Sequence, residues 1–158
     1  MDATVAAMPL EGRFEGQDHH FPLRVYFEDT DLSGVVYHAN YLRYMERVRS
    51  AMLRVAGVDQ RAAFEGGEGA YAIRDLTIRY AAPARLDDTL TVVSRLVSMR
   101  SASVVIQQRV MRASVILTHA QVEAAFVAPS GRPRRQPPAW VQAFERLIAR
   151  EEQGNPWN

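Results

Sequence analysis

The order of the expected elements in this 158-residue chain predicts an α+β protein, with one strand, one long helix and then four strands. The helix is indicated by apolar residues at helical spacing between residues 41 and 55. After residue 70 the pattern changes to runs rich in Val, Ile, Leu and Tyr, at residues 70–82, 89–99, 102–111 and 115–127. Because short connections between successive strands favour antiparallel hairpins, we expect an antiparallel sheet beside one helix.

The composition limits the class of protein. A length of 158 residues and a formal net charge of +1 suit a single domain with its own core and give no electrostatic footprint of a nucleic-acid binder. The chain has no cysteine, which excludes disulfides, thiolate metal sites and cysteine nucleophiles. The N-terminus lacks the pattern of a signal peptide, and nowhere do about eighteen apolar residues follow one another. We therefore expect a soluble cytoplasmic protein with no membrane span and no nucleic-acid partner.

Residues 1–20 mix Gly, Asp, Glu, Gln and Pro without a period, which indicates a flexible N-terminal arm. His19 and His20 are adjacent, so their side chains point apart in an extended chain, and we expect no metal there. The following run, residues 23–27, is rich in β-branched and aromatic residues and is the first expected strand.

A carboxylate-bearing turn at residues 28–41 joins this strand to the helix, which we expect at residues 39–56. The turn contains the turn formers Thr30, Asp31, Ser33 and Gly34. A helix that begins near Ala39 directs its unpaired backbone N–H groups, and its positive dipole end, toward Asp31. Gly57 is the expected left-handed residue just past the helix end. A carboxylate beside such donors is placed to act on a carbonyl group.

This region resembles the signature of the hotdog-fold acyl-CoA thioesterases, specifically the hydroxybenzoyl-CoA thioesterase family and its branch of Tol-Pal-associated acyl-CoA thioesterases. The matching motifs are Tyr26-Phe27-Glu28-Asp29-Thr30-Asp31, Gly34-Val35-Val36-Tyr37-His38-Ala39-Asn40-Tyr41 and Met45-Glu46-Arg47, with a weaker likeness at residues 78–88. The resemblance implies a hotdog domain at residues 21–148, in which a five-stranded antiparallel sheet wraps a long central helix, followed by a polar tail at 149–158. It also implies homodimers with a continuous sheet, which are often doubled to homotetramers.

Thioester hydrolysis needs an attacking oxygen and a donor for the charge that grows on the carbonyl oxygen. Asp31 can be the nucleophile or the base for water, and the backbone N–H near His38, after the Gly34-Val35 turn, can be the oxyanion donor. The resemblance implies the same roles at these positions. Tyr37 and His38 are candidates to donate to the substrate or to orient Asp31. The structural alternatives are an Asx turn or helix cap for Asp31 and helix-entry packing for His38.

Two other carboxylates compete with Asp31 or modify it. Asp29 lies two residues away, where like-charge repulsion would raise the pKa of Asp31, although a carboxylate in this position more often caps or pairs. Glu46 lies on the helix, and some hotdog thioesterases place their catalytic carboxylate there. Arg43 and Arg49 lie at helical neighbour spacing from Glu46. We therefore expect Glu46 to form a salt bridge with one of them and to have a structural role.

The remaining segments complete the fold prediction. Residues 57–69 are glycine-rich and are expected to form a loop. The consecutive apolar residues Val104, Val105 and Ile106 suggest strands that are partly buried on both faces, and one helix cannot cover both. We therefore expect another subunit to cover the second face. A helix with Trp140, Phe144 and Leu147 on one side is expected at residues 139–150.

Basic residues in two connections are candidates for binding the phosphates of CoA: Arg100 and Ser101 in one hairpin, with Arg132, Arg134 and Arg135 in a proline-containing loop. The alternative is that these arginines are only solvated.

Taken together, the sequence predicts an acyl-CoA thioesterase that uses Asp31 and a backbone oxyanion site and needs no metal or cofactor. A thioester of acyl carrier protein is a possible substrate. The alternatives are a non-catalytic hotdog module that binds an acyl thioester or a partner, and a hotdog hydratase or dehydratase with a His base. The acyl chain preference cannot be predicted from the residue pattern.

Overall fold

The structure is a computed structural model that describes residues 7–148. Six strands form one antiparallel sheet in the order β1-β2-β4-β5-β6-β3. They are β1 (Arg13–Glu15), β2 (Asp18–Arg24), β3 (Ala70–Tyr80), β4 (Thr89–Met99), β5 (Ser103–Arg112) and β6 (Val115–Val127). The helices are α1 (Asn40–Val55), α2 (Gln60–Glu65) and α3 (Pro138–Ile148), with a short 3-10 turn η1 (Phe27–Asp29). The predicted α+β class is confirmed, although the sheet has six strands rather than five.

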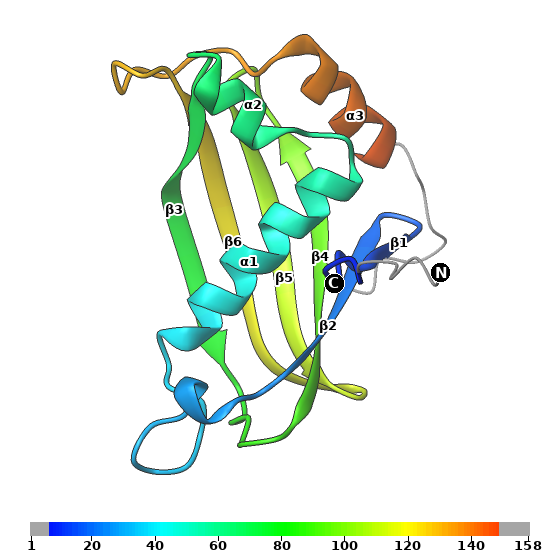
Figure 1. Ribbon diagram of the computed structural model, residues 1–158, viewed down its shortest axis with the longest axis vertical. Helices are drawn as coiled ribbons and strands as arrows, with labels where there is room; N and C mark the ends of the chain where they lie inside the picture. Colours follow the sequence, from blue (N-terminus) through cyan, green and yellow to red (C-terminus); the bar gives the residue numbers. More distant parts are fainter. Residues whose placement is uncertain (1–6, 149–158) are drawn as a thin grey trace, which may run out of the picture.

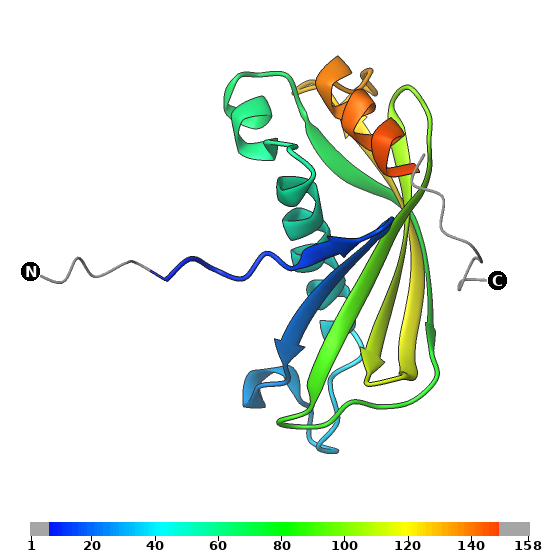
Figure 2. The ribbon, with the colours of Figure 1, turned by 90° about the vertical axis from the view of Figure 1, so that its right-hand side faces the viewer.

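Helix α1 lies across one face of the sheet, with β3 at one edge and the β1–β2 hairpin at the other (Figure 1). The strands curve around it, as Figure 2 shows from the side. The helix buries the predicted apolar stripe, because Tyr41, Met45, Val48 and Met52 are each at most 3% exposed. Val55 is 43% exposed and does not belong to this core. Gly57 has φ +91° and ends the helix as predicted.

The N-terminal arm was predicted without regular structure, and for residues 13–20 this was wrong. They form β1 and the start of β2, and β1 pairs with β2 in register Phe14 with His19. Packing stabilises the hairpin, because His19 is fully buried and its ring lies 5.2 Å from that of Phe14. A strand of three residues is too short to show a pattern in the sequence. Residues 1–6 lie outside the described part of the chain.

Two further expectations about local structure were also wrong. The predicted loop at residues 57–69 contains α2, which begins because the Asp59 side chain accepts the backbone N–H of Ala62 at 3.0 Å. The strand expected at residues 23–27 ends at Arg24, because the Asp29 carboxylate accepts the Tyr26 N–H at 2.8 Å and supports the turn η1.

The last predicted helix is present as α3, which buries Trp140, Phe144 and Leu147. The Trp140 ring lies 5.3 Å from that of Phe126 on β6, so α3 extends the core at that end of the sheet. Residues 149–158, the predicted polar tail, lie outside the described residues.

The face of the sheet turned away from α1 is less apolar than the sequence suggested. Val104 and Ile106 are buried toward the helix, and Val105 between them is half-buried. Its neighbours on the outer face are mostly polar or charged: Gln107, Arg109, His119, Gln121 and Glu123. Exposed surface is found instead on β3, which lies at one edge of the sheet and has eight of its eleven residues exposed.

Candidate active site

The loop that follows η1 is fixed at both ends by backbone bonds. Thr30 forms a β-bridge with Val36, and Val35 forms another with Arg85. Within the loop the Gly34 N–H donates to the Asp31 carbonyl oxygen at 3.0 Å, and Gly34 has φ +82°, a conformation that only glycine adopts readily. Gly34 and Val35 therefore shape the turn that presents Asp31.

Asp31 is fully exposed at this turn. Its Oδ1 accepts the Ser33 backbone N–H at 2.8 Å and the Ser33 hydroxyl at 2.5 Å, which is the Asx-turn geometry considered as the structural alternative. The hydroxyl bond is the main cause that lowers the pKa of Asp31, followed by the backbone bond, and the nearby His38 lowers it further. Asp29 is not among the causes of this pKa shift, so of its two alternatives the structure favours capping and pairing over repulsion. The Asp31 carboxylate is ionised and has a free Oδ2 in the described structure.

The start of α1 offers an unpaired donor. No side chain caps the helix at Ala39, and the His38 backbone N–H has no hydrogen-bond acceptor among residues 7–148. The His38 carbonyl oxygen accepts the Tyr80 hydroxyl at 2.7 Å, which fixes the next peptide unit, on the C-terminal side of His38. Because the positive end of the helix dipole lies here, this N–H is suited to an oxyanion.

Apolar surface adjoins the donor. A cavity of about 300 Å³ is lined by residues of the helix start, the end of β3 and the segment after it: Val36, His38, Tyr41, Tyr80, Ala81, Ala82 and Pro83. The exposed Tyr37 ring lies 4.5 Å from that of His38. His38 thus belongs both to this cavity and to the electrostatic surroundings of Asp31.

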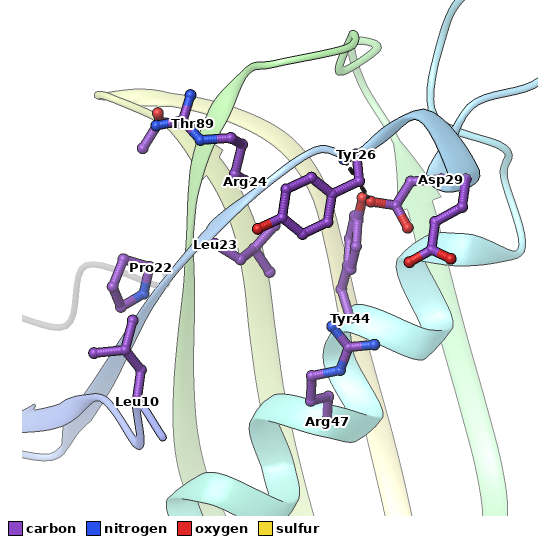
Figure 3. Close-up of a pocket in the computed structure, with 10 residues that line it drawn as sticks. Leu10, Pro22, Leu23, Arg24, Tyr26, Asp29, Tyr44, Arg47 and Thr89 are labelled. Carbon is purple, nitrogen blue, oxygen red and sulfur yellow. Dashed lines mark hydrogen bonds between the residues drawn. The ribbon is translucent and has the colours of Figure 1, made fainter. Parts of the chain in front are cut away.

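Asp29 connects the loop to the helix. Its sequence position predicted a capping or pairing role, and the structure shows its partners. Its Oδ1 accepts the Asn40 side-chain amide at 2.9 Å, and its Oδ2 accepts the Tyr26 N–H (Figure 3). Its carbonyl oxygen accepts the Tyr37 N–H at 2.9 Å. The Tyr44 hydroxyl points toward Asp29 from α1 (Figure 3), and burial, with the Asp29 carboxylate, raises the pKa of Tyr44. Asn40 and Tyr80 were both missed as site residues.

The other candidate carboxylate, Glu46, does not form the expected salt bridge. It has no ion pair within residues 7–148. Arg49 turns into the protein instead and donates to the Gln108 side-chain oxygen at 2.9 Å. Glu46 therefore stays exposed on α1.

The connections that contain the predicted CoA-binding residues, between β4 and β5 and between β6 and α3, lie at the other end of the sheet from the loop that follows η1 (Figure 1). Ser101, Arg134 and Arg135 line one cavity of about 660 Å³ beside α3, whereas Arg100 and Arg132 do not line it. Arg134 also donates to the carbonyl oxygens of Glu68 at 2.6 Å and Gly67 at 3.4 Å. Within one chain, this cluster and Asp31 are separated by roughly the length of the eleven-residue β4, which extends about 33 Å.

Neither a membrane-spanning helix nor a metal-binding cluster occurs within residues 7–148. No helix of residues 7–148 is long and apolar enough to cross a membrane. The same residues contain no group of three or more His, Asp or Glu side chains that could hold a metal ion.

Comparison with known proteins gives consistent matches. The family model described as the thioesterase superfamily matches residues 33–118. The acyl-CoA thioester hydrolase YbgC of Escherichia coli is 41% identical over 128 residues, which are 80% of this chain and 95% of that protein. The acyl-CoA thioesterase YbgC of Haemophilus influenzae is 41% identical over 68% of this chain and 79% of that protein. The crystal structure of a probable thioesterase from Bartonella henselae has a TM-score of 0.72 at 37% identity, covering 76% of this chain and 99% of that one.

Proposed function

Since this chain belongs to the thioesterase superfamily, we propose that it hydrolyses acyl-CoA thioesters to a free carboxylic acid and CoA. One observation carries the mechanism: an exposed, ionised carboxylate, Asp31, lies beside a helix start whose His38 N–H has no acceptor in the described structure. The curated E. coli relative is named an acyl-CoA thioester hydrolase, which supports the same reaction. The fold is the predicted hotdog fold.

Asp31 supplies the attack in one of two ways. As a nucleophile, its free Oδ2 adds to the thioester carbonyl carbon, the C–S bond breaks, and water then hydrolyses the mixed anhydride. As a general base, it removes a proton from the water that attacks the same carbon. The bond from Ser33 leaves one carboxylate oxygen available for either role.

The His38 backbone N–H stabilises the oxyanion in both mechanisms, because the donor is fixed before the charge forms. The Gly34-Val35 turn sets the approach of the loop to this donor. The side chains of Tyr37 and His38 border the reacting group, and the apolar cavity between His38 and Tyr80 receives hydrocarbon from the acyl group or the pantetheine arm.

We further propose that the working unit is a homodimer, or a homotetramer built from such dimers, joined through β3. Within residues 7–148 this strand pairs with β6 alone, so the backbone groups along its other edge have no strand partner there. Ile73 and Tyr80 on it are 49% and 44% exposed. An open strand edge is a template for pairing with a second copy. Pairing would continue the sheet and would cover the side of α1 that faces β3.

This arrangement also resolves the distance between Asp31 and the basic cluster. A two-fold axis makes β3 antiparallel to its copy, so the Ala70 end of one strand lies near the Tyr80 end of the other. Ala70 pairs with Val127, and Val127 bridges to Pro133, so the basic loop belongs to the Ala70 end. Arg134 and Arg135 of the partner subunit would therefore approach the His38 and Tyr80 end, where CoA phosphates would emerge.

A thiol-release assay across a series of acyl-CoAs tests the proposal, with thioesters of acyl carrier protein as a second substrate series. Release of free CoA is the expected result. A protein that binds acyl-CoA without releasing thiol would be a binding module, and one that changes the acyl chain but retains the thioester would be a hydratase or dehydratase. The cytoplasmic location stays a prediction.

Single turnover in ¹⁸O-labelled water separates the two roles of Asp31. Label in the Asp31 carboxylate would show an anhydride opened at the aspartyl carbon and would exclude pure general-base catalysis. Label in the released acid fits direct attack by water, and it also fits an anhydride opened at the acyl carbon.

A further inference from the structure

The two reacting groups of the proposed site lie on different elements. Asp31 is on the loop after η1, whereas the His38 N–H belongs to the start of α1. Catalysis by positioned groups needs the reacting atoms within about 3–3.5 Å of one another, and a displacement of about 1 Å can cost about 100-fold in rate. Something must therefore fix the loop against the helix.

Asp29 and Asn40 make that connection. The Asn40 side-chain amide donates to the Asp29 carboxylate at 2.9 Å, and this side-chain hydrogen bond joins the segment 26–37 directly to α1. The other Asp29 oxygen holds the Tyr26 N–H at 2.8 Å, and the Asp29 carbonyl oxygen holds the Tyr37 N–H at 2.9 Å. One residue thus ties the strand end, the helix-entry turn and the helix itself.

The environment of the pair makes its hydrogen bond costly to lose. Asn40 is 7% exposed, so an unpaired amide there would lack water to replace its partner. Within residues 7–148 no side chain caps helix α1 at Ala39. The Asp29 carboxylate bonds to the side chain of the first helical residue, Asn40, where a negative charge complements the helix dipole. Both Asp29 oxygens are occupied, which leaves this carboxylate no free oxygen for the attack.

We propose that Asp29 and Asn40 form a positioning pair that sets the separation between the Asp31 carboxylate and the His38 backbone N–H. This inference rests on the proposed function, since it assigns the pair a role through those two groups.

Reciprocal substitution tests the pair. Asn40→Asp opposes two carboxylates, and Asp29→Asn leaves one oxygen to serve two donors, the Tyr26 N–H and the Asn40 amide. The double variant Asp29→Asn/Asn40→Asp restores both bonds, because the amide at position 29 can accept from Tyr26 and donate to the carboxylate at position 40. Each single variant should lower kcat by about 10- to 100-fold with KM within about threefold. The double variant should recover at least about tenfold of the loss.

The swap also separates positioning from direct catalysis. If the Asp29 carboxylate took part in the chemistry, moving it to position 40 would not restore kcat. A matched control is Asp59→Asn, which alters a carboxylate that accepts a backbone N–H at the remote start of α2. This control should leave kcat unchanged and the melting temperature close to that of wild type, because Asn caps a helix about as well as Asp.

Three results would overturn the positioning role: singles that fold and keep wild-type kcat, a folded swap no faster than the slower single, or an equal loss of kcat in Asp59→Asn. Asp29→Asn is nearly isosteric and keeps the test open if Asn40→Asp does not fold. Failure of the proposed function is seen separately, as an inactive wild type or a fully active Asp31→Asn variant. In that case hydrogen exchange of the Asn40 N–H, which bonds the Tyr37 carbonyl oxygen, decides whether the swap restores the helix entry.

Discussion

The Tyr80 hydroxyl at the end of β3 donates a hydrogen bond of 2.7 Å to the His38 carbonyl oxygen at the start of α1. This bond connects the open edge of the sheet to the residue whose backbone N–H is proposed as the oxyanion donor. Tyr80→Phe removes only the hydroxyl, and a typical net hydrogen bond of about 0.5–1.5 kcal/mol corresponds to a fall in kcat of about 2- to 10-fold. Steady-state kinetics, with a melting curve to confirm folding, would check this. An unchanged kcat would show that the Tyr80 bond to His38 does not contribute to catalysis.

The second prediction ranks the two candidate carboxylates. Asp31→Asn preserves the size of the side chain but removes the attacking oxygen or base, so kcat should fall by about 10²- to 10⁴-fold while the protein stays folded. Glu46→Gln should change kcat by less than about threefold, because Glu46 is exposed and has no ion pair in residues 7–148. The opposite ranking would move the catalytic carboxylate onto α1.

The third prediction concerns pH. Asp31 must be ionised to act, and the bonds from Ser33 lower its pKa, so the acidic limb of kcat/KM should lie below the ordinary pKa of an aspartate. Ser33→Ala removes the largest cause of that shift, so the Asp31 pKa should rise and the limb should move to higher pH. Ser114→Ala, in an exposed hairpin turn, is the matched control. A limb that does not move would mean that another group controls the acidic side of the profile.

The fourth prediction tests the basic cavity. Replacing Arg134 and Arg135 by alanine should raise KM for acyl-CoA more than it lowers kcat, since phosphate contacts are alike in the ground and transition states. The effect should weaken at high salt. Arg61→Ala, which removes an exposed pair with Glu65, provides a control with the same change of side chain. Equal KM values for the double variant and wild type at low salt would show that these arginines are only solvated and do not bind CoA.

The fifth prediction tests the assembly. Sedimentation at micromolar concentration should give at least twice the mass of the 17.8 kDa chain. Ile73→Lys places a charge on the half-exposed edge strand and should shift the population toward monomer, with loss of activity. A wild-type monomer with full activity would remove the inter-subunit part of the site.

Periodicity and local motifs were sufficient for the main elements. The strands from residue 70 onward and helix α1 are long, so many residues repeat the same signal, and their observed limits lie within two residues of those expected. The six-residue α2 depends on one cap, Asp59, and the three-residue β1 depends on packing around His19. Such short elements depend on single contacts, which hydrophobic periodicity does not predict.

The site was predictable only where it is local. Asp31, Gly34 and His38 lie in one continuous turn, so their proximity follows from the motif. The Asp29–Asn40 bond spans eleven residues and the Tyr80–His38 bond spans 42, and both depend on how loop, helix and sheet meet. The separation of Asp31 from Arg134 likewise follows from the directions of the strands. The sequence positions of the basic residues alone do not show at which end of the sheet they lie.

The uncapped start of α1 has a further consequence for protein engineering. A side-chain cap typically stabilises a helix by about 1 kcal/mol, and this helix forgoes it at Ala39. A cap at position 39 would accept N–H groups of the first helical turn, but redesign guided by thermal stability alone would also favour polar substitutions that accept the neighbouring His38 N–H. Each such substitution would occupy the proposed place of the substrate oxygen. Heat-resistant variants chosen in this way should therefore include well-folded, inactive proteins, unless residues 37–40 are held fixed.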